Sequence, residues 1–116
     1  MARLLDLPKP PRAVVSANNL MTLGALQAIH ERGAAIPEQV AIVGFDDMPW
    51  ATSLRPPLTV VTQPAEELGR IAAQLLLERF QEPKRLVRQV VLPTQLIVRA
   101  SCGAHPPMKA EARRSV

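Results

Sequence analysis

The chain has little of what several classes of protein require. It contains one cysteine, Cys102, so no intrachain disulfide can form and nothing favours an oxidising compartment. Aromatic residues make up 3% of the 116 residues, which disfavours base-stacking surfaces for single-stranded nucleic acid. No apolar run approaches a membrane span, and the N-terminus has no apolar stretch of signal-peptide length. We therefore expect a soluble cytoplasmic protein that does not contact membranes.

Residues suited to catalysis or metal binding are also sparse. The two histidines, His30 and His105, have no second histidine or cysteine at metal-ligand spacing. Ser16 and Ser53 lack the context of a nucleophile elbow, and Gly24 has no partner glycine for a dinucleotide-binding turn. We therefore expect no enzyme activity, no metal site and no cofactor.

The net charge of +4 suggests nucleic-acid binding until the charges are located. Residues 1–12 carry a net +2, residues 103–116 carry another +2, and residues 13–102 hold eight basic and eight acidic side chains. A DNA-binding face concentrates positive charge on a folded element. Because the excess lies on the chain ends, we do not expect this chain to bind DNA by charge.

Polar side chains follow two apolar segments at the points where predicted strands end. Residues 40–45 read as a strand buried on both faces, and Asp46 and Asp47 follow it directly. Residues 13–17 form a second predicted strand that runs into Asn18 and Asn19. In open α/β sheets, ligands bind outside the carboxyl ends of the strands, so these positions predict half of a small-molecule site.

Two helices and further short strands complete the predicted inventory. A helix over 20–32 can be capped by either Asn18 or Asn19, and a second helix is predicted over 64–82 from its apolar periodicity. The remaining predicted strands are short and cover residues 59–62, 89–92 and 96–99. Between Asp46 and Pro57, three prolines disfavour any long element.

These elements predict an α/β protein with part of a doubly wound parallel sheet. Such a sheet needs helices on both faces, and two helices are too few to cover it, so the chain reads as part of a larger domain. We divide it into a lead-in over 1–12, a folded portion over 13–102 and a disordered tail over 103–116.

Several segments together resemble one family. They are residues 14–21 (Val-Val-Ser-Ala-Asn-Asn-Leu-Met), 43–47 (Val-Gly-Phe-Asp-Asp), 55–64 (Arg-Pro-Pro-Leu-Thr-Val-Val-Thr-Gln-Pro) and 92–99 (Leu-Pro-Thr-Gln-Leu-Ile-Val-Arg). In this order, over about residues 12 to 101, they resemble the C-terminal part of the effector-binding domain of lactose-repressor-type (LacI/GalR) transcription regulators.

The resemblance implies a periplasmic-binding-protein-like fold, in which two α/β subdomains close around a sugar, a nucleobase or a similar metabolite. It implies that Asn18 and Asp46 reach the effector and that Gln63 lies near the crossover between subdomains. It also assigns the helix over 64–82 to the second subdomain and the first helix to a homodimer interface. The implied function is effector sensing and dimerisation, which modulates DNA binding in the full-length protein.

The chain departs from the family in two respects. Asn19 stands where the family usually has aspartate. The helix-turn-helix, the hinge helix and most of the N-terminal subdomain are also missing from these residues, so DNA contact is expected only through segments that the chain lacks. Two alternatives stay open: a truncated interaction fragment that binds no ligand, and a fragment of a sugar-binding transport protein.

Each candidate site residue has a structural alternative. Asp46 can be a turn aspartate and Asn18 a helix cap, while Gln63, which precedes a proline, can be a plain linker residue. Asp47 is more typical of a turn or cap than of a ligand contact. Trp50 fits an interface or the local core better than a sugar-stacking position.

Overall fold

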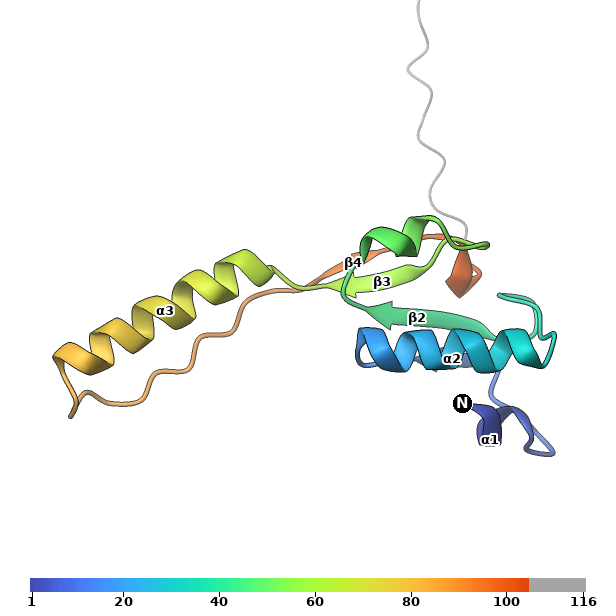
Figure 1. The fold of residues 1–116 in the computed structure, drawn as a ribbon, viewed down its shortest axis with the longest axis horizontal. Helices are drawn as coiled ribbons and strands as arrows, with labels where there is room; N and C mark the ends of the chain where they lie inside the picture. The colour runs from blue at the N-terminus through green and yellow to red at the C-terminus, as the bar shows by residue number, and fades with distance from the viewer. Residues whose placement is uncertain (105–116) are drawn as a thin grey trace, which may run out of the picture.

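The computed structural model describes residues 1–104 (Figure 1). The chain forms, in order, helix α1 (Ala2–Leu5), strand β1 (Ala13–Val15), helix α2 (Asn19–Glu31), strand β2 (Ala41–Phe45), 3-10 helix η1 (Pro49–Thr52), strand β3 (Thr59–Thr62), helix α3 (Ala65–Gln81), strand β4 (Gln95–Ile97) and 3-10 helix η2 (Ala100–Cys102).

The strands form one four-stranded sheet in the order β1-β2-β3-β4. β1, β2 and β3 run parallel, with Val14 beside Ile42 and Gly44 beside Val60, whereas β4 returns antiparallel to β3. The α/β class and the mostly parallel sheet predicted from the sequence are confirmed. Because three parallel strands share a direction, their carboxyl ends lie along one edge of the sheet.

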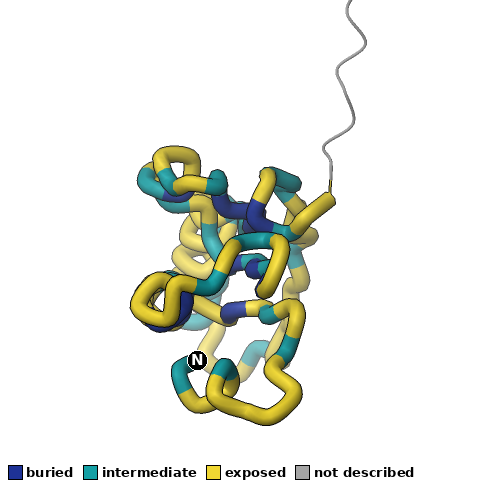
Figure 2. Tube along the Cα trace, turned by 90° about the vertical axis from the view of Figure 1, so that its right-hand side faces the viewer, coloured by how far each residue is buried: buried dark blue, intermediate teal, exposed yellow. Residues whose placement is uncertain are grey.

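One face of the sheet carries the hydrophobic core. Helix α2 packs there through Ala25 and Ile29 against Ile42 and Val60, and these residues are all buried. Most buried residues lie on α2, β2 and β3, with one each on η1 and η2, and the buried stretches are short and separated by exposed chain (Figure 2). A Cβ added at Gly44 would meet the Thr22 side chain of α2 at 3.3 Å and that of Leu58 at 3.1 Å, so the glycine lets the sheet and α2 approach closely.

The opposite face is largely uncovered within residues 1–104, except at Thr59, which is buried and bonded to Arg99 and Ser101. The register places Val15 beside Val43 and Phe45 beside Val61 on that face. Val15 is 77% exposed and the other three are only partly buried. The sheet is therefore covered on one side, although a doubly wound sheet has helices on both.

Helix α3 extends away from the sheet, and the chain after it runs back alongside the helix to β4 (Figure 1). We call α3 together with residues 82–94 the arm. No residue of α3 is buried, and Leu76, Leu77 and Phe80 are all exposed. The arm thus presents apolar side chains to solvent.

Several sequence-based boundaries were wrong. Residues 89–92 form no strand, because this apolar run lies along α3, where no strand edge can pair with it. The last strand is Gln95–Ile97 rather than 96–99, and the first ends at Val15 rather than at residue 17. The short helix α1 in the lead-in was not predicted. Gly103, placed in the predicted tail, closes η2 with φ 75°, and residues 105–116 lie outside the described part.

Candidate functional site

Asp46 and Gln63 meet at the carboxyl edge of the sheet. Asp46 follows β2 and Gln63 follows β3, and the side-chain amide Nε2 of Gln63 donates a 2.8 Å hydrogen bond to Oδ1 of Asp46. The backbone N–H of Asp46 donates to the carbonyl oxygen of Val61 at 2.8 Å. Both side chains are partly buried. The structure therefore joins two residues that the sequence placed at separate strand ends.

Asp46 has an unusual backbone conformation. Its φ is 70°, and it is the one non-glycine residue with positive φ in the described chain. Aspartate tolerates this left-handed region better than most residues, yet the conformation still costs about 1 kcal/mol and persists only where the surroundings fix it. Such positions gather at ligand sites, which favours a binding role for Asp46 over that of a plain turn residue.

Asn18, at the end of β1, caps helix α2. Its side-chain Oδ1 accepts the backbone N–H of Met21 at 2.8 Å, as an N-cap residue does. The structure thus shows Asn18, rather than Asn19, in the capping role that the sequence left open. The Asn18 side chain remains exposed, so its amide group still faces the solvent at the same edge as Asp46.

Asn19 begins α2, and its side-chain oxygen is buried with no hydrogen-bond partner among residues 1–104. A buried acceptor without a donor is unfavourable. This is the position at which the sequence departs from the resembling family.

Asp47 forms an ion pair with Arg99. The guanidinium of Arg99 donates to both carboxylate oxygens of Asp47, at 2.8 and 2.7 Å, and donates a third bond to the carbonyl oxygen of Leu58 at 2.8 Å. This hydrogen-bonded cation lowers the pKa of the Asp47 carboxyl below its ordinary value. Both oxygens of Asp47 are engaged, which favours the structural role over ligand contact.

Trp50 lies in η1 and packs against the buried core cluster. It is partly buried rather than enclosed. Of the roles predicted for it, the local core position is the one that the structure displays.

A buried polar network was not anticipated from the sequence. The fully buried Ser101 hydroxyl donates to the carbonyl oxygen of Ile42 at 2.6 Å and accepts the backbone N–H of Thr59 at 2.8 Å. The Thr59 hydroxyl donates to the carbonyl oxygen of Arg99 and accepts its N–H. These partners lie 40 or more residues apart in sequence, so no local pattern could reveal them.

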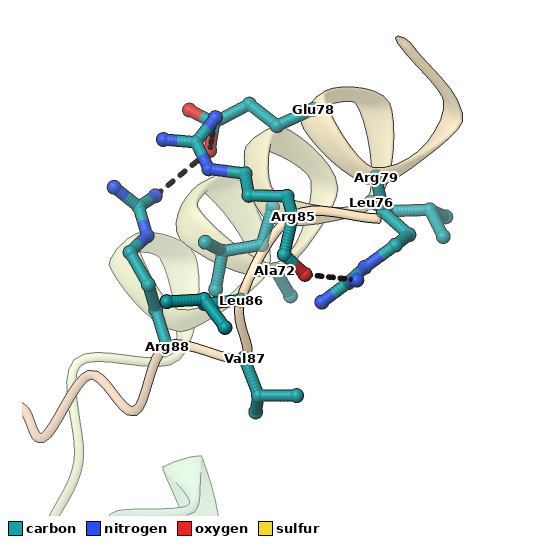
Figure 3. Close-up of a pocket in the computed structure, with 9 residues that line it drawn as sticks. Ala72, Leu76, Glu78, Arg79, Arg85, Leu86, Val87 and Arg88 are labelled. Atoms are coloured by element: carbon teal, nitrogen blue, oxygen red, sulfur yellow. Dashed lines mark hydrogen bonds and ion pairs between the residues drawn. The ribbon is translucent and has the colours of Figure 1, made fainter. Parts of the chain in front are cut away.

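Two grooves lie away from this edge. One of about 560 Å³ lies between α1, β1 and α2 and is lined by Val15, Met21 and Gly24 among others. The second, of about 310 Å³, lies between α3 and the returning chain, where Arg85 and Arg88 converge on Glu78 (Figure 3). A third arginine of this groove, Arg79, donates to the carbonyl oxygens of Pro83 and Arg85, so its polar groups bond to one another within the arm. Neither groove contains Asp46 or Gln63.

Other kinds of site find no support in residues 1–104. No group of three or more histidine, cysteine, aspartate or glutamate side chains is arranged to hold a metal ion there. No helix in this part of the chain is long and apolar enough to cross a membrane.

When this chain is compared with known sequences, the similar proteins are transcriptional regulators. The model of the periplasmic binding protein-like domain family matches residues 1–102. The transcriptional repressor CytR of Escherichia coli (strain K12) is 40% identical over 106 residues, which are 91% of this chain and 31% of CytR. The lactose operon repressor of Rhizobium radiobacter is 43% identical over 98 residues, covering 84% of this chain and 86% of that protein. These relatives are transcriptional repressors rather than enzymes.

The solved structures that resemble this chain are also those of transcriptional regulators. A LacI transcriptional regulator from Bacillus cereus subsp. cytotoxis NVH 391-98 aligns with a TM-score of 0.79 and 29% identity, over 89% of this chain and 36% of that one. A LacI family regulator from Enterococcus faecalis V583 with bound ribose gives 0.72 and 33%, over 85% and 36%. The lac repressor dimer bound to operator and the anti-inducer ONPF gives 0.73 and 30%, over 87% and 30%. The chain thus spans about a third of the length of these structures and of CytR.

Proposed function

Because this chain belongs to the periplasmic-binding-protein-like domain of LacI-family transcription regulators, we propose that it is the effector-sensing and dimerisation portion of such a regulator. In the full-length protein, binding of a sugar or similar small metabolite would modulate DNA binding. We place that protein in the cytoplasm, where a regulator meets both its effector and its operator.

The observation that carries the proposal is the Asp46–Gln63 pair at the carboxyl edge of the sheet. A carboxylate accepts hydrogen bonds from sugar hydroxyl groups, whereas a carboxamide both donates and accepts. Asn18 adds a second amide, which is exposed, at the end of the neighbouring parallel strand. These three residues offer a polyhydroxylated ligand complementary groups along one edge.

Related structures support sugars as the ligand class. One LacI family regulator from Enterococcus faecalis holds ribose, and the regulator CelR, which is 42% identical to this chain, was solved as a cellobiose complex. Those ligands belong to those proteins. For this chain we propose a sugar first, with nucleobases as the second class.

The mechanism we propose uses the position of Gln63. This residue lies between β3 and α3, so its bond to Asp46 ties the start of the arm to the sheet edge. A ligand hydroxyl that donates to the Asp46 carboxylate competes with the Gln63 amide and weakens the hydrogen bond between Asp46 and Gln63. The ligand would thereby shift the population of arm orientations, as a closing second subdomain requires. The assignment of α3 to that subdomain is part of this proposal.

Homodimerisation is proposed from the outer surface of α2. Leu20, Met21 and Leu23 are exposed on this helix, and the related lac repressor was solved as a dimer. DNA contact would come from segments that the longer relatives have beyond the matched region.

The proposal can be tested by calorimetric titration of the chain with D-ribose, cellobiose and a nucleobase, adenine. We expect one of them to bind, and we expect Asp46→Asn to weaken binding by about tenfold or more because a charged acceptor is lost. Asparagine tolerates the left-handed turn, so the backbone is preserved. The matched control is Asp6→Asn, which removes an exposed aspartate paired with Arg32 and should leave affinity unchanged. Equal affinity in the wild type and Asp46→Asn would contradict the proposal.

A second candidate function is an interaction fragment that pairs with itself without ligand. The uncovered sheet face and the exposed apolar residues of the arm favour it, because such surfaces promote association. Sedimentation velocity over micromolar concentrations distinguishes the two candidates. A chain that self-associates but binds no ligand in the calorimetric titration supports the interaction fragment. A strictly monomeric chain excludes it. The transport-protein alternative is not favoured, because the relatives named above are repressors.

A further inference from the structure

The loop after β2 is held from both sides. The Asp46 N–H is bonded to Val61 on the sheet, and the next backbone hydrogen bond of this segment in the described chain is Ala51 N–H to the carbonyl of Met48. Two side-chain contacts also hold the loop: the Asp46 carboxylate accepts the Gln63 amide, and the Asp47 carboxylate is bonded to Arg99.

Arg99 is itself fixed. Its backbone N–H and carbonyl oxygen are both bonded to the Thr59 hydroxyl, and its side chain is only 16% exposed. The planar guanidinium spans from the Asp47 carboxylate to the Leu58 carbonyl, which a lysine ammonium could not reproduce with the same geometry. Arg99 thus links the β4–η2 junction to the loop that carries Asp46, across 52 residues of sequence.

We propose that Arg99 is a positioning residue for the effector site: by holding Asp47, it keeps Asp46 in its left-handed turn and sets where the Asp46 carboxylate lies relative to Gln63. The inference rests on the proposed function only in treating Asp46 as an effector contact. The side-chain hydrogen bonds of Arg99 in the described chain go to Asp47 and Leu58, so it acts on Asp46 through the neighbouring residue.

A second arginine–aspartate ion pair elsewhere in the chain serves as a control that distinguishes positioning of Asp46 from general stabilisation of the fold. Arg32 also holds both carboxylate oxygens of Asp6, through Nε at 2.9 Å and Nη2 at 2.7 Å, but the Asp6 side chain is 62% exposed and lies on the lead-in. An exposed pair of this kind contributes little. Arg32→Gln therefore removes an equivalent interaction without touching the loop at Asp46.

The test is amide hydrogen exchange on the full chain, with no ligand added. The measured quantity is the exchange rate of the Asp46 amide divided by that of Ile29, which lies in the core helix and reports global opening. We expect Arg99→Gln to raise this ratio by about tenfold or more, as expected when hydrogen bonds to a charged group are lost. Arg99→Lys should restore it only in part, and Arg32→Gln should leave it unchanged.

Asp47→Asn keeps the arginine and serves as the second variant. If Arg99→Gln unfolds the chain, Asp47→Asn decides the result, and the same rise in the ratio is expected. A ratio equal to that of the wild type in any folded variant lacking the pair overturns the proposal, since it would show that Arg99 stabilises the fold without positioning Asp46. Failure of the calorimetric titration would instead remove the effector role of Asp46 and leave the positioning result intact.

Discussion

The sheet body and the arm are built in opposite ways. The body, from β1 to β3 with β4 and η2, encloses Ile42, Leu58 and Val60 with almost no exposure, and its polar groups bond across distant parts of the chain. The arm has no buried residue on α3, and its contacts are short-range, such as the Arg70–Glu67 pair one turn apart. In proteins, most of the stability of a helix comes from tertiary packing of its apolar face, which α3 lacks within residues 1–104.

This difference shows which part of the chain specifies its own structure. The body contains both the core and the edge that carries Asp46. The arm displays an amphipathic helix whose partner surface is not within residues 1–104. We infer that the body forms the cooperative unit and that the arm gains order through what packs on it.

The largest expected effect compares two leucines. Leu58 is 1% exposed in the body and Leu77 is 62% exposed on the arm. Leu58→Ala should lower the free energy of unfolding by about 2–5 kcal/mol because it leaves a cavity. Leu77→Ala should change it by about 0.5 kcal/mol or less. Urea unfolding followed by circular dichroism measures both, and similar losses would show that the arm is packed.

A smaller effect is expected from the buried hydroxyl network. Ser101→Ala leaves the N–H of Thr59 and the carbonyl of Ile42 without their shared partner. The expected loss is about 1–3 kcal/mol in the same unfolding measurement. The exposed Ser53 provides the control, since Ser53→Ala should have little effect. If the two variants were equally stable, the network would not hold the body together.

The pH dependence should also be concentrated in the body. The folded pKa of Asp47 lies below its ordinary value, so its ion pair stabilises the fold above that value. This contribution is lost as pH falls below 3.8, the ordinary pKa of an aspartate, and through the lowered folded pKa. The stability difference between wild type and Asp47→Asn, measured by urea unfolding, should therefore be largest near neutral pH and shrink in acid. A difference independent of pH would contradict the assignment of the ion pair.

The smallest effect should come from the arm pair. The Arg70 guanidinium lowers the pKa of the Glu67 carboxyl, but both side chains are largely exposed. Arg70→Gln should slightly reduce helix content at 222 nm without moving the unfolding midpoint of the body. A shifted midpoint would mean that the arm and the body unfold together.

The sequence predicted those elements whose signals are local. The helices came from their apolar periodicity and capping residues, and the strand over 59–62 was placed correctly. The strand predicted over 89–92 was wrong because β-forming residues need a neighbouring strand edge, which sequence alone cannot supply.

In the candidate site, too, the sequence predicted the local features and missed the contacts between distant residues. Asp46 was identified because it follows a strand and Gln63 because of the family resemblance, yet their mutual hydrogen bond depends on the pairing of β2 with β3. Arg99 and Ser101 were overlooked as individual residues. Their partners lie 40 or more positions away, and one arginine or serine carries no local pattern.

The central claim is that the carboxyl edge of the sheet binds a small sugar, and the side-chain amide of Gln63 reports on it most directly. Its NMR signal can be followed while D-ribose or cellobiose is added to the labelled chain. We predict a saturable shift of this signal and of the Asp46 amide, absent in Asp46→Asn, while the amides at the far end of α3 stay unmoved. Signals that do not move with either sugar, or that move equally in Asp46→Asn, would contradict the account.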